Sequence, residues 1–213
     1  METVDAADVI RELREERAEQ DSEERFRSGV ALAIAVLATL LAVASLGGGN
    51  VSEDVVNSNI HASDTWAFYQ AKNIRQTAMN LAADEMEATL LVNGAGLSAD
   101  ARADIEEKVA KYRATAARYD DEPDPAAPTD SLRGEGKKQL TVQARSHEAK
   151  RDRAQEQDAN FDYASVLYQI AIVLGSVAIL ALSRPVLGVA LALGGVATLL
   201  MLNGFFLFAH LPL

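Results

Sequence analysis

The stretch that decides the fold is residues 164–208, ASVLYQIAIVLGSVAILALSRPVLGVALALGGVATLLMLNGFFLF. It contains two apolar runs, 164–182 and 186–208, which are separated only by Ser183-Arg184-Pro185, and neither run contains Asp, Glu, Lys or Arg. A helix rises about 1.5 Å per residue, so about 20 apolar residues cross the hydrocarbon core of a bilayer. Each run approaches or exceeds this length, and the pair predicts a transmembrane helical hairpin.

A third apolar run lies near the N-terminus, at residues 29–46. An acidic extension precedes it, which is the wrong charge for a signal peptide, so an uncleaved anchor is favoured although Ala42-Val43-Ala44 resembles a cleavage site. Gly47-Gly48-Gly49-Asn50 follows, and three glycines lose so much backbone entropy in a helix that we expect the helix to end there.

These runs predict an all-α integral membrane protein with three transmembrane helices and an extramembrane antiparallel helical region. The segments are an acidic polar tail (1–28), a first transmembrane helix (29–46), the extramembrane region (47–162), a second transmembrane helix (163–183) and a third (186–209). The tail has few apolar residues, so we expect it to be marginally helical at best.

The extramembrane region has helical spacing and no alternating pattern typical of strands. Its predicted helices run from about Ser63 to Val92, from Ser98 to about Tyr119, and from Lys137 without interruption into the second apolar run. In the first of them the apolar residues fall largely on one face: Trp66, Ile74, Ala78, Leu81, Ala88 and Leu91. Pro185 suits the first turn of the third transmembrane helix, where its missing N–H is not needed.

The composition excludes several classes of function. The net charge of −11 argues against nucleic acid as a partner, because binding phosphates requires a basic surface. The chain has no cysteine, which removes disulfides, thiolate catalysis and cysteine-ligated zinc. The partners we expect are the lipid bilayer, further copies of the chain, and an unidentified protein.

Basic residues near the apolar runs indicate the orientation. Arg17, Arg25 and Arg27 precede the first run, and Arg184 must lie on the same side if all three runs span. Lys150, Arg151 and Arg153 lie at the opposite side. The positive-inside rule favours a cytoplasmic N-terminus, but by a margin of about one residue, so the side of the middle region stays open.

Small residues recur in the apolar runs and predict close helix–helix packing in lipid. The candidates are Ala35, Ala42, Ala171, Gly175, Gly188, Ala192 and Gly194. The strongest polar residues in these runs are Gln169, Thr198 and Asn203, which we expect to form hydrogen bonds between helices rather than to bind a substrate. The runs lack charged residues, which argues against an ion-coupled carrier but not against a passive pore.

Motifs for catalysis, cofactors or metals are not recognisable. His61, His147 and His210 have no second histidine three or four residues away, so each is expected to be a surface or packing residue. Residues 134–138 fail the Walker pattern, and the acidic turn at 120–124 lacks the spacing of an EF-hand. We therefore expect no catalytic residue, no cofactor, no metal and no enzymatic activity.

One aromatic and polar segment is distinctive: residues 64–72, DTWAFYQAK, which include the single tryptophan. Trp66 and Tyr69 are suited to anchor the chain at the membrane interface. Alternatively, Asp64, Gln70 and Lys72 pair with a neighbouring subunit or line a vestibule. Both interpretations stay open, and these five residues are the candidate interface.

This segment resembles the Asp-x-Trp-x-x-Tyr-Gln-Ala-Lys signature of domain-of-unknown-function family 4337, a group of bacterial membrane proteins. Residues 161–172 and 175–178 resemble the family's second span, whereas the turn Ser183-Arg184-Pro185 departs slightly from the family's pattern. The resemblance implies a three-span protein of the bacterial inner membrane, and it implies no activity.

The function we expect is that of a homo-oligomeric, non-catalytic membrane scaffold or interaction protein. Three spans are too few to enclose a pathway within one subunit. The alternative is therefore a passive ion channel or pore that several subunits form around an axis.

Overall fold

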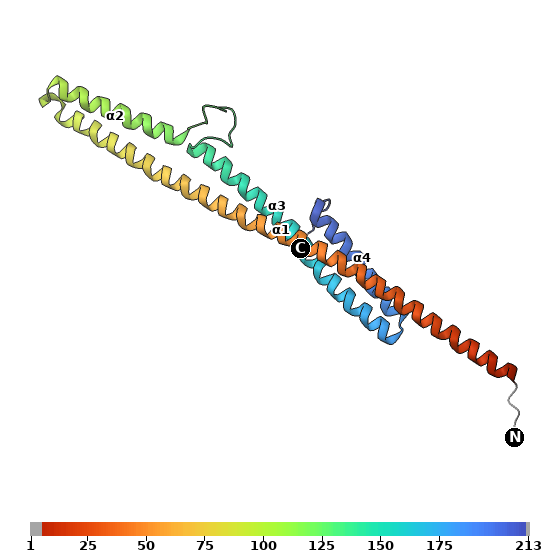
Figure 1. Ribbon diagram of the computed structural model, residues 1–213. Coiled ribbons are helices and arrows are strands. Elements are labelled where there is room, and N and C mark those ends of the chain that lie inside the picture. The colour runs from red at the N-terminus through yellow and green to blue at the C-terminus, as the bar shows by residue number, and fades with distance from the viewer. Residues whose placement is uncertain (1–5, 212–213) are drawn as a thin grey trace. The chain divides into compact units, whose positions relative to one another are not determined.

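The computed structural model describes residues 6–211, and in this range the secondary structure is helical. The helices are α1 (Ala6–Asn93), the short 3-10 helix η1 (Gly94–Gly96), α2 (Ala99–Asp120), α3 (Lys137–Ala181) and α4 (Arg184–Phe206) (Figure 1). Within these residues the β pairing is limited to one isolated bridge between Pro123 and Gly134. The predicted all-α fold is confirmed.

The chain folds into two compact units. Unit 1 contains residues 6–53 and 154–211, and unit 2 is Asp54–Arg153. Helices α1 and α3 each contribute residues to both units, α4 belongs to unit 1, and α2 belongs to unit 2.

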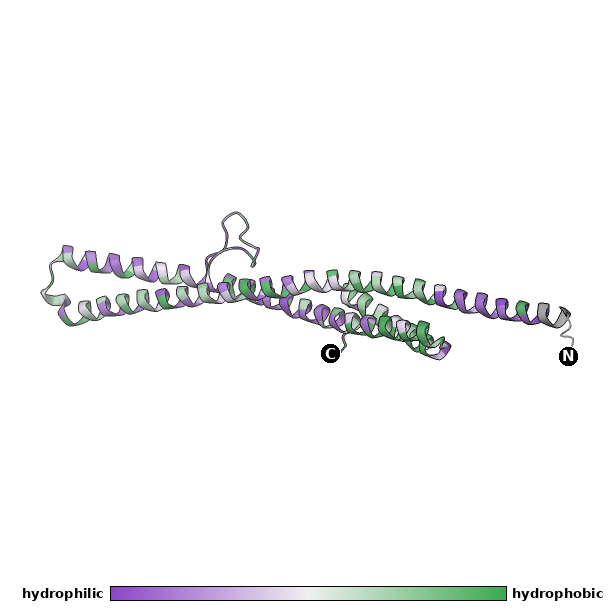
Figure 2. Cartoon of the chain, turned by 60° about the horizontal axis from the view of Figure 1, so that its bottom comes forward, coloured by the Kyte–Doolittle hydropathy of each residue, from purple (hydrophilic) through white to green (hydrophobic). Residues whose placement is uncertain are grey.

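Unit 1 carries the apolar runs. Among the described helices, α1, α3 and α4 are long and apolar enough to cross a membrane. Their apolar parts are green in Figure 2, whereas the part of α1 before its apolar run is purple. Large apolar side chains such as Leu32, Val173 and Leu199 point outward in these parts, as lipid-facing residues do.

The core of unit 1 forms around two aromatic side chains of α3, Phe161 and Tyr168, which are fully buried. The cluster is completed by smaller residues from α1, α3 and α4: Leu37, Ala44, Ala164, Ala171, Ala197 and Met201. Glycines allow the backbones to approach the Phe161 ring. A Cβ atom on Gly47 would lie 2.7 Å from Phe161 Cε1, and one on Gly204 would lie 2.9 Å from Phe161 Cε2.

The predicted helix end at Gly47–Asn50 is wrong, because α1 continues through these residues to Asn93. Gly47 faces the Phe161 ring, with which a Cβ would collide, and a Cβ on Gly48 would make a tight contact of 3.2 Å with the Phe161 Cβ. The tertiary contact therefore outweighs the low helix propensity of the glycines.

The N-terminal tail is also more helical than predicted, since α1 begins at Ala6; residues 1–5 lie outside the described range. A helix that already exists lengthens easily, because nucleation is its costly step. Ion pairs one turn apart, Arg11 with Glu15 and Arg27 with Glu23, add a small stabilisation.

Unit 2 is an antiparallel assembly in which the C-terminal part of α1 packs against α2 and the start of α3 (Figure 1). The predicted boundaries of α2 are confirmed to within a residue, as is the predicted start of α3 at Lys137. The Ser98 hydroxyl caps α2 by accepting a hydrogen bond from the Ala101 N–H at 3.2 Å, and α3 begins at Lys137 and runs to Ala181.

Most of the apolar face identified on α1 in unit 2 is exposed. Ile74 and Leu91 are 70% and 87% exposed, whereas Ala62, Lys72 and Ala83 are buried. Small and polar residues pack here because α2 and the connection after it offer hydrogen-bonding groups to α1. Apolar periodicity alone therefore identified the outer side of this helix.

Candidate functional site

The signature segment 64–72 lies on α1, and its Trp66, Tyr69 and Lys72 follow one another at intervals of three residues. This spacing places them on one side of the helix. Trp66 Nε1 donates a hydrogen bond to Glu148 Oε1 of α3 at 2.8 Å, and the Trp66 and Tyr69 rings meet edge to face at 5.6 Å. These side chains attach α1 to the beginning of α3.

Lys72 is the most deeply buried charged residue among those described, at 3% exposure. Its Nζ donates to Glu122 Oε2 at 2.7 Å and lies 3.6 Å from Glu135 Oε2. It also lies 5.3 Å from the centre of the Phe68 ring and 5.7 Å from that of Tyr119. Two carboxylates and two aromatic faces thus replace the water that the ammonium group loses on burial.

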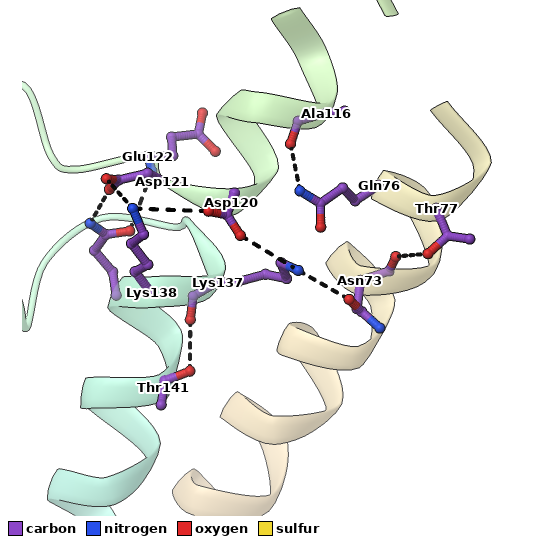
Figure 3. A network of polar contacts seen from close by, with 11 residues as sticks. Asn73, Gln76, Thr77, Ala116, Asp120, Asp121, Glu122, Lys137, Lys138 and Thr141 are labelled. Carbon is purple, nitrogen blue, oxygen red and sulfur yellow. Dashed lines mark hydrogen bonds and ion pairs between the residues drawn. The ribbon is translucent and has the colours of Figure 1, made fainter. Parts of the chain in front are cut away.

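A second lysine, Lys137, joins the same three elements at the first residue of α3. Its Nζ donates to Asn73 Oδ1 of α1 at 3.1 Å and lies 3.6 Å from Asp120 Oδ1 of α2 (Figure 3). One turn away, Gln76 Nε2 donates to the Ala116 carbonyl at 2.9 Å. We call the region where α1, the end of α2 and the start of α3 meet the junction.

The connection from α2 to α3 is fixed by Asp121 and Gln139. Gln139 Nε2 donates to Asp121 Oδ1 at 2.8 Å, and Lys138 Nζ lies 3.0 Å from Asp121 Oδ2. The hydrogen bond from Gln139, followed by that from Lys138, lowers the pKa of Asp121, and the same carboxylate raises the pKa of Lys138. Gly136 is required next to them, because a Cβ there would lie 2.2 Å from the Glu122 nitrogen.

The chemistry of the junction is that of a structural clamp. Its lysines face carboxylates of the same chain, and no buried side-chain nitrogen or oxygen in the described residues lacks a partner. The described part of the chain contains no group of three or more His, Cys, Asp or Glu residues suited to a metal ion.

The five candidate interface residues therefore separate into two sets. Trp66, Tyr69 and Lys72 are engaged within unit 2, whereas Asp64 and Gln70 are exposed on α1 and take no part in the junction. Lys72 finds its acidic partners in its own chain.

The candidate packing residues also separate. Ala171, Gly175 and Gly194 are buried in unit 1, where Cβ atoms on the two glycines would lie 2.9 Å from Ile34 and 2.5 Å from Leu37. The others, Ala35, Ala42, Gly188 and Ala192, are exposed. Nothing lies within 4 Å of a Cβ placed on Gly188.

Two of the three intramembrane polar residues form hydrogen bonds inside unit 1. The hydroxyls of Thr198 and Tyr168 lie 2.9 Å apart. Asn203 is buried, and its amide donates to Asn160 Oδ1 at 3.0 Å. Gln169 is instead exposed on the outer side of α3.

A histidine pair escaped sequence reasoning. The rings of His61 on α1 and His147 on α3 stack in unit 2 with centroids 5.3 Å apart. Burial, followed by the charges of His61 and Lys150, lowers the pKa of His147. Spacing along the chain carries no signal for this pair, because only the pairing of two distant helices brings the rings together. The third histidine, His210, lies 3.0 Å from Glu156 in unit 1.

Comparison with known proteins supplies one match. Residues 26–207 match the family described as Domain of unknown function (DUF4337), and the match includes the signature segment and the three apolar runs. No curated protein and no solved structure matches the chain. The match extends over most of the sequence, and the chain therefore belongs to the DUF4337 family.

Proposed function

We propose that the protein is a self-assembling, non-catalytic scaffold of the bacterial inner membrane. The observation that supports this proposal is an exposed apolar stripe on α1 in unit 2, outside the apolar runs. Its residues repeat every seven positions, with a second set four positions further on. We call them the α1 stripe: Ile60, Ala67, Ala71, Ile74, Ala78, Leu81, Ala88 and Val92, of which Ala71 is half-buried and the others are exposed.

The α1 stripe is more exposed than apolar side chains in water normally remain. Ile74, Leu81 and Val92 are 70%, 57% and 80% exposed. Burying one such side chain contributes about 1.5–3 kcal/mol, and contiguous exposed apolar patches are typical of interaction sites. A seven-residue repeat is the pattern by which helices pair in coiled coils. Asp64 and Glu85 interrupt the second set, so the expected pairing is loose.

A second copy of this chain is the partner that suits the stripe. Copies inserted in one membrane in the same orientation carry their α1 helices in parallel, so equal heptad positions can meet. Confinement to a bilayer also raises the effective concentration of copies. In unit 1 the outward Gly188 and Ala192 leave room for close contact between helices of different copies.

The test is the mass of the purified protein in a mild detergent, by light scattering corrected for bound amphiphile. We expect a discrete oligomer, and we expect Ile74→Glu with Leu81→Glu to shift it to smaller species. Leu132→Glu is the matched control, because Leu132 is 50% exposed but lies in the connection before α3. A monomeric wild-type protein would overturn the proposal. So would a shift to smaller species in Leu132→Glu as large as that in the double variant.

A second candidate function is a passive channel formed by several copies. Gln169 favours it, because this amide is exposed on the outer side of an apolar run, where an axis between subunits would hydrate it. Ion flux through reconstituted protein should then change with Gln169→Leu and not with Val173→Leu, a change at another exposed position of α3. If a verified oligomer conducted no ions, the channel would be rejected and the scaffold would be the only remaining proposal.

We also propose that the N-terminus is cytoplasmic, on the basis of the arginines before the first run and in the turn between α3 and α4. The chain contains no cysteine, so single cysteines can report the orientation. Arg17→Cys should be protected from an impermeant thiol reagent in intact cells, whereas Asp130→Cys should react. The reverse pattern would contradict this orientation.

A further inference from the structure

A hollow of about 630 Å³ lies in unit 1 where α1 reaches its apolar run beside the turn between α3 and α4. Its lining residues are Ser22, Arg25, Phe26, Arg184 and Leu187. A smaller hollow of about 100 Å³ adjoins it; it shares Ser22, Phe26 and Arg184 and is also lined by Glu23 and Leu182. Helix α1 and the turn between α3 and α4 thus bring two exposed arginines to one open hollow.

Neither arginine forms an ion pair with a carboxylate within residues 11–211, the part of the chain whose side chains are described. Arg25 Nε donates only to the Asp21 carbonyl of its own helix, at 3.2 Å. Arg27 differs, because it lies 3.5 Å from Glu23. The larger hollow therefore has two guanidinium groups without an ion-pairing carboxylate among these residues, and the nearest acidic lining residue, Glu23, belongs to the adjoining hollow.

The hollow lies at the height expected for phospholipid headgroups. Arg25 precedes the first apolar run by four residues, and Arg184 lies in the gap between the second and third runs. Phe26 and Leu187 are half-buried and provide apolar walls beside the two charges. A phosphate with an attached acyl chain has this combination of charge and apolar surface, and basic pockets between membrane helices bind such headgroups.

The geometry points to a binding site for the phosphate of an anionic phospholipid headgroup, held by Arg25 and Arg184 in the hollow at the end of the three membrane helices. The planar guanidinium fork binds phosphate oxygens in pairs, which a lysine does not do. Helix α4 begins at Arg184, and its N-terminal N–H groups favour an anion at the same place.

General attraction to an anionic surface does not explain such a site, because the chain carries a net charge of −11. A free phosphate ester shares the headgroup chemistry but lacks the acyl chains that would lie along Phe26 and Leu187. The site is independent of self-assembly, because both arginines belong to one copy.

The experiment uses the full chain in mild detergent, titrated with phosphatidylglycerol while native mass spectrometry counts the lipids retained by each subunit. We expect one tightly held lipid, and we expect Arg25→Gln with Arg184→Gln to weaken its retention by about tenfold or more, since a charge-assisted hydrogen bond contributes enough for that factor. Arg27→Gln is the matched control, because it removes the same charge from the same part of α1 without lining the hollow. Its effect should be less than about twofold.

Three outcomes would overturn the assignment. The first is that Arg27→Gln weakens lipid retention as much as the double variant does, which would indicate diffuse attraction. The second is that the double variant retains the lipid as wild type does. The third is that millimolar glycerol phosphate displaces the lipid, which would indicate a site for free phosphate. If the double variant loses its helical circular dichroism, Leu187→Trp replaces it. This variant fills the hollow without changing charge and should expel the lipid, and full retention would count against the site.

Discussion

The two units hold their helices together by different means. In unit 1 the Phe161 ring fits between glycines of α1 and α4, and its buried polar side chains form hydrogen bonds, Tyr168 with Thr198 and Asn203 with Asn160. In unit 2 small residues are buried together with the ammonium group of Lys72, which two carboxylates hold in place. Shape therefore specifies the first unit, and charge specifies the second.

The difference follows from the surroundings of each unit. Lipid is as apolar as a leucine side chain, so helices in a membrane gain little from hiding apolar surface and must gain from close contact. In water, charged side chains remain soluble when helices separate and can select one arrangement when they meet. The same α1 helix carries both kinds of contact, Gly47 in one unit and Lys72 in the other.

The largest expected effect is the loss of the Phe161 ring. Phe161→Ala would leave a cavity between the glycines and should lower the free energy of unfolding of unit 1 by about 3 kcal/mol. Hydrogen exchange, read separately for peptides of the two units, measures this change. Phe206→Ala is the control at a position that is 71% exposed, and it should cost less than about 1 kcal/mol. Equal losses in the two variants would refute packing by shape.

A smaller effect is expected from breaking the Lys72 contact. Lys72→Met removes the buried cation from Glu122 and Glu135 and leaves Glu122 with only the exposed Arg118, 3.5 Å away. We expect a loss of about 2 kcal/mol in unit 2. This value is below the usual cost of breaking a buried pair because Glu122 is about one-third exposed. Lys108→Met, at an exposed position of α2, is the control for loss of charge. If Lys72→Met increased hydrogen exchange more in unit 1 than in unit 2, the assignment of this contact to unit 2 would be contradicted.

Arg113 tests the exposed part of the same electrostatic arrangement. It links α2 to Asp84 and Glu87 of α1, and these hydrogen bonds raise the pKa of Arg113. Arg113→Gln should lower the melting temperature less than Lys72→Met does, and high salt should abolish the difference from wild type, because exposed pairs are screened. A loss that persists at high salt would show that packing of the side chain matters more than its charge.

The smallest effect is a dependence on pH. Because the folded state lowers the pKa of His147 below its ordinary value of 6.5, the unfolded state binds the proton more readily. The contribution of neutral His147 to the stability of unit 2 is therefore fully present above pH 6.5, and it is lost as the pH falls from there toward the folded-state pKa. Melting curves in this range should show the decline in wild type and a weaker one in His147→Gln. His210→Gln, in unit 1, should keep the pH dependence of the wild-type melting temperature. If this variant lost that dependence, His147 would not be its source.

Local signals predicted much of the fold. The length of the apolar runs predicted the three candidate spans, Ser98 predicted the start of α2, and the absence of Gly and Pro after Lys137 predicted the unbroken α3. Each of these features depends on neighbours in the sequence.

The misjudged features depend on distant residues. The glycines at 47–49 signal a helix end unless Phe161 is known to pack on Gly47 and Gly48, and the inner side of α1 is unclear until Glu122 is seen to meet Lys72. The His61–His147 pair and the hollow at Arg25 and Arg184 likewise arise only when segments far apart in sequence meet. Of the candidate site, the signature segment was identified from sequence, but its division into inward and outward residues was not.

The glycines beneath the Phe161 ring also impose an order of events during synthesis. The first apolar run leaves the ribosome well before Phe161 does, and domains form progressively as a chain emerges. Until the ring arrives, Gly47 and Gly48 have nothing to pack on and retain the backbone freedom that opposes a helix. We therefore expect the continuous α1 to become stable at Gly47 and Gly48 only once the residues around Phe161 have been delivered.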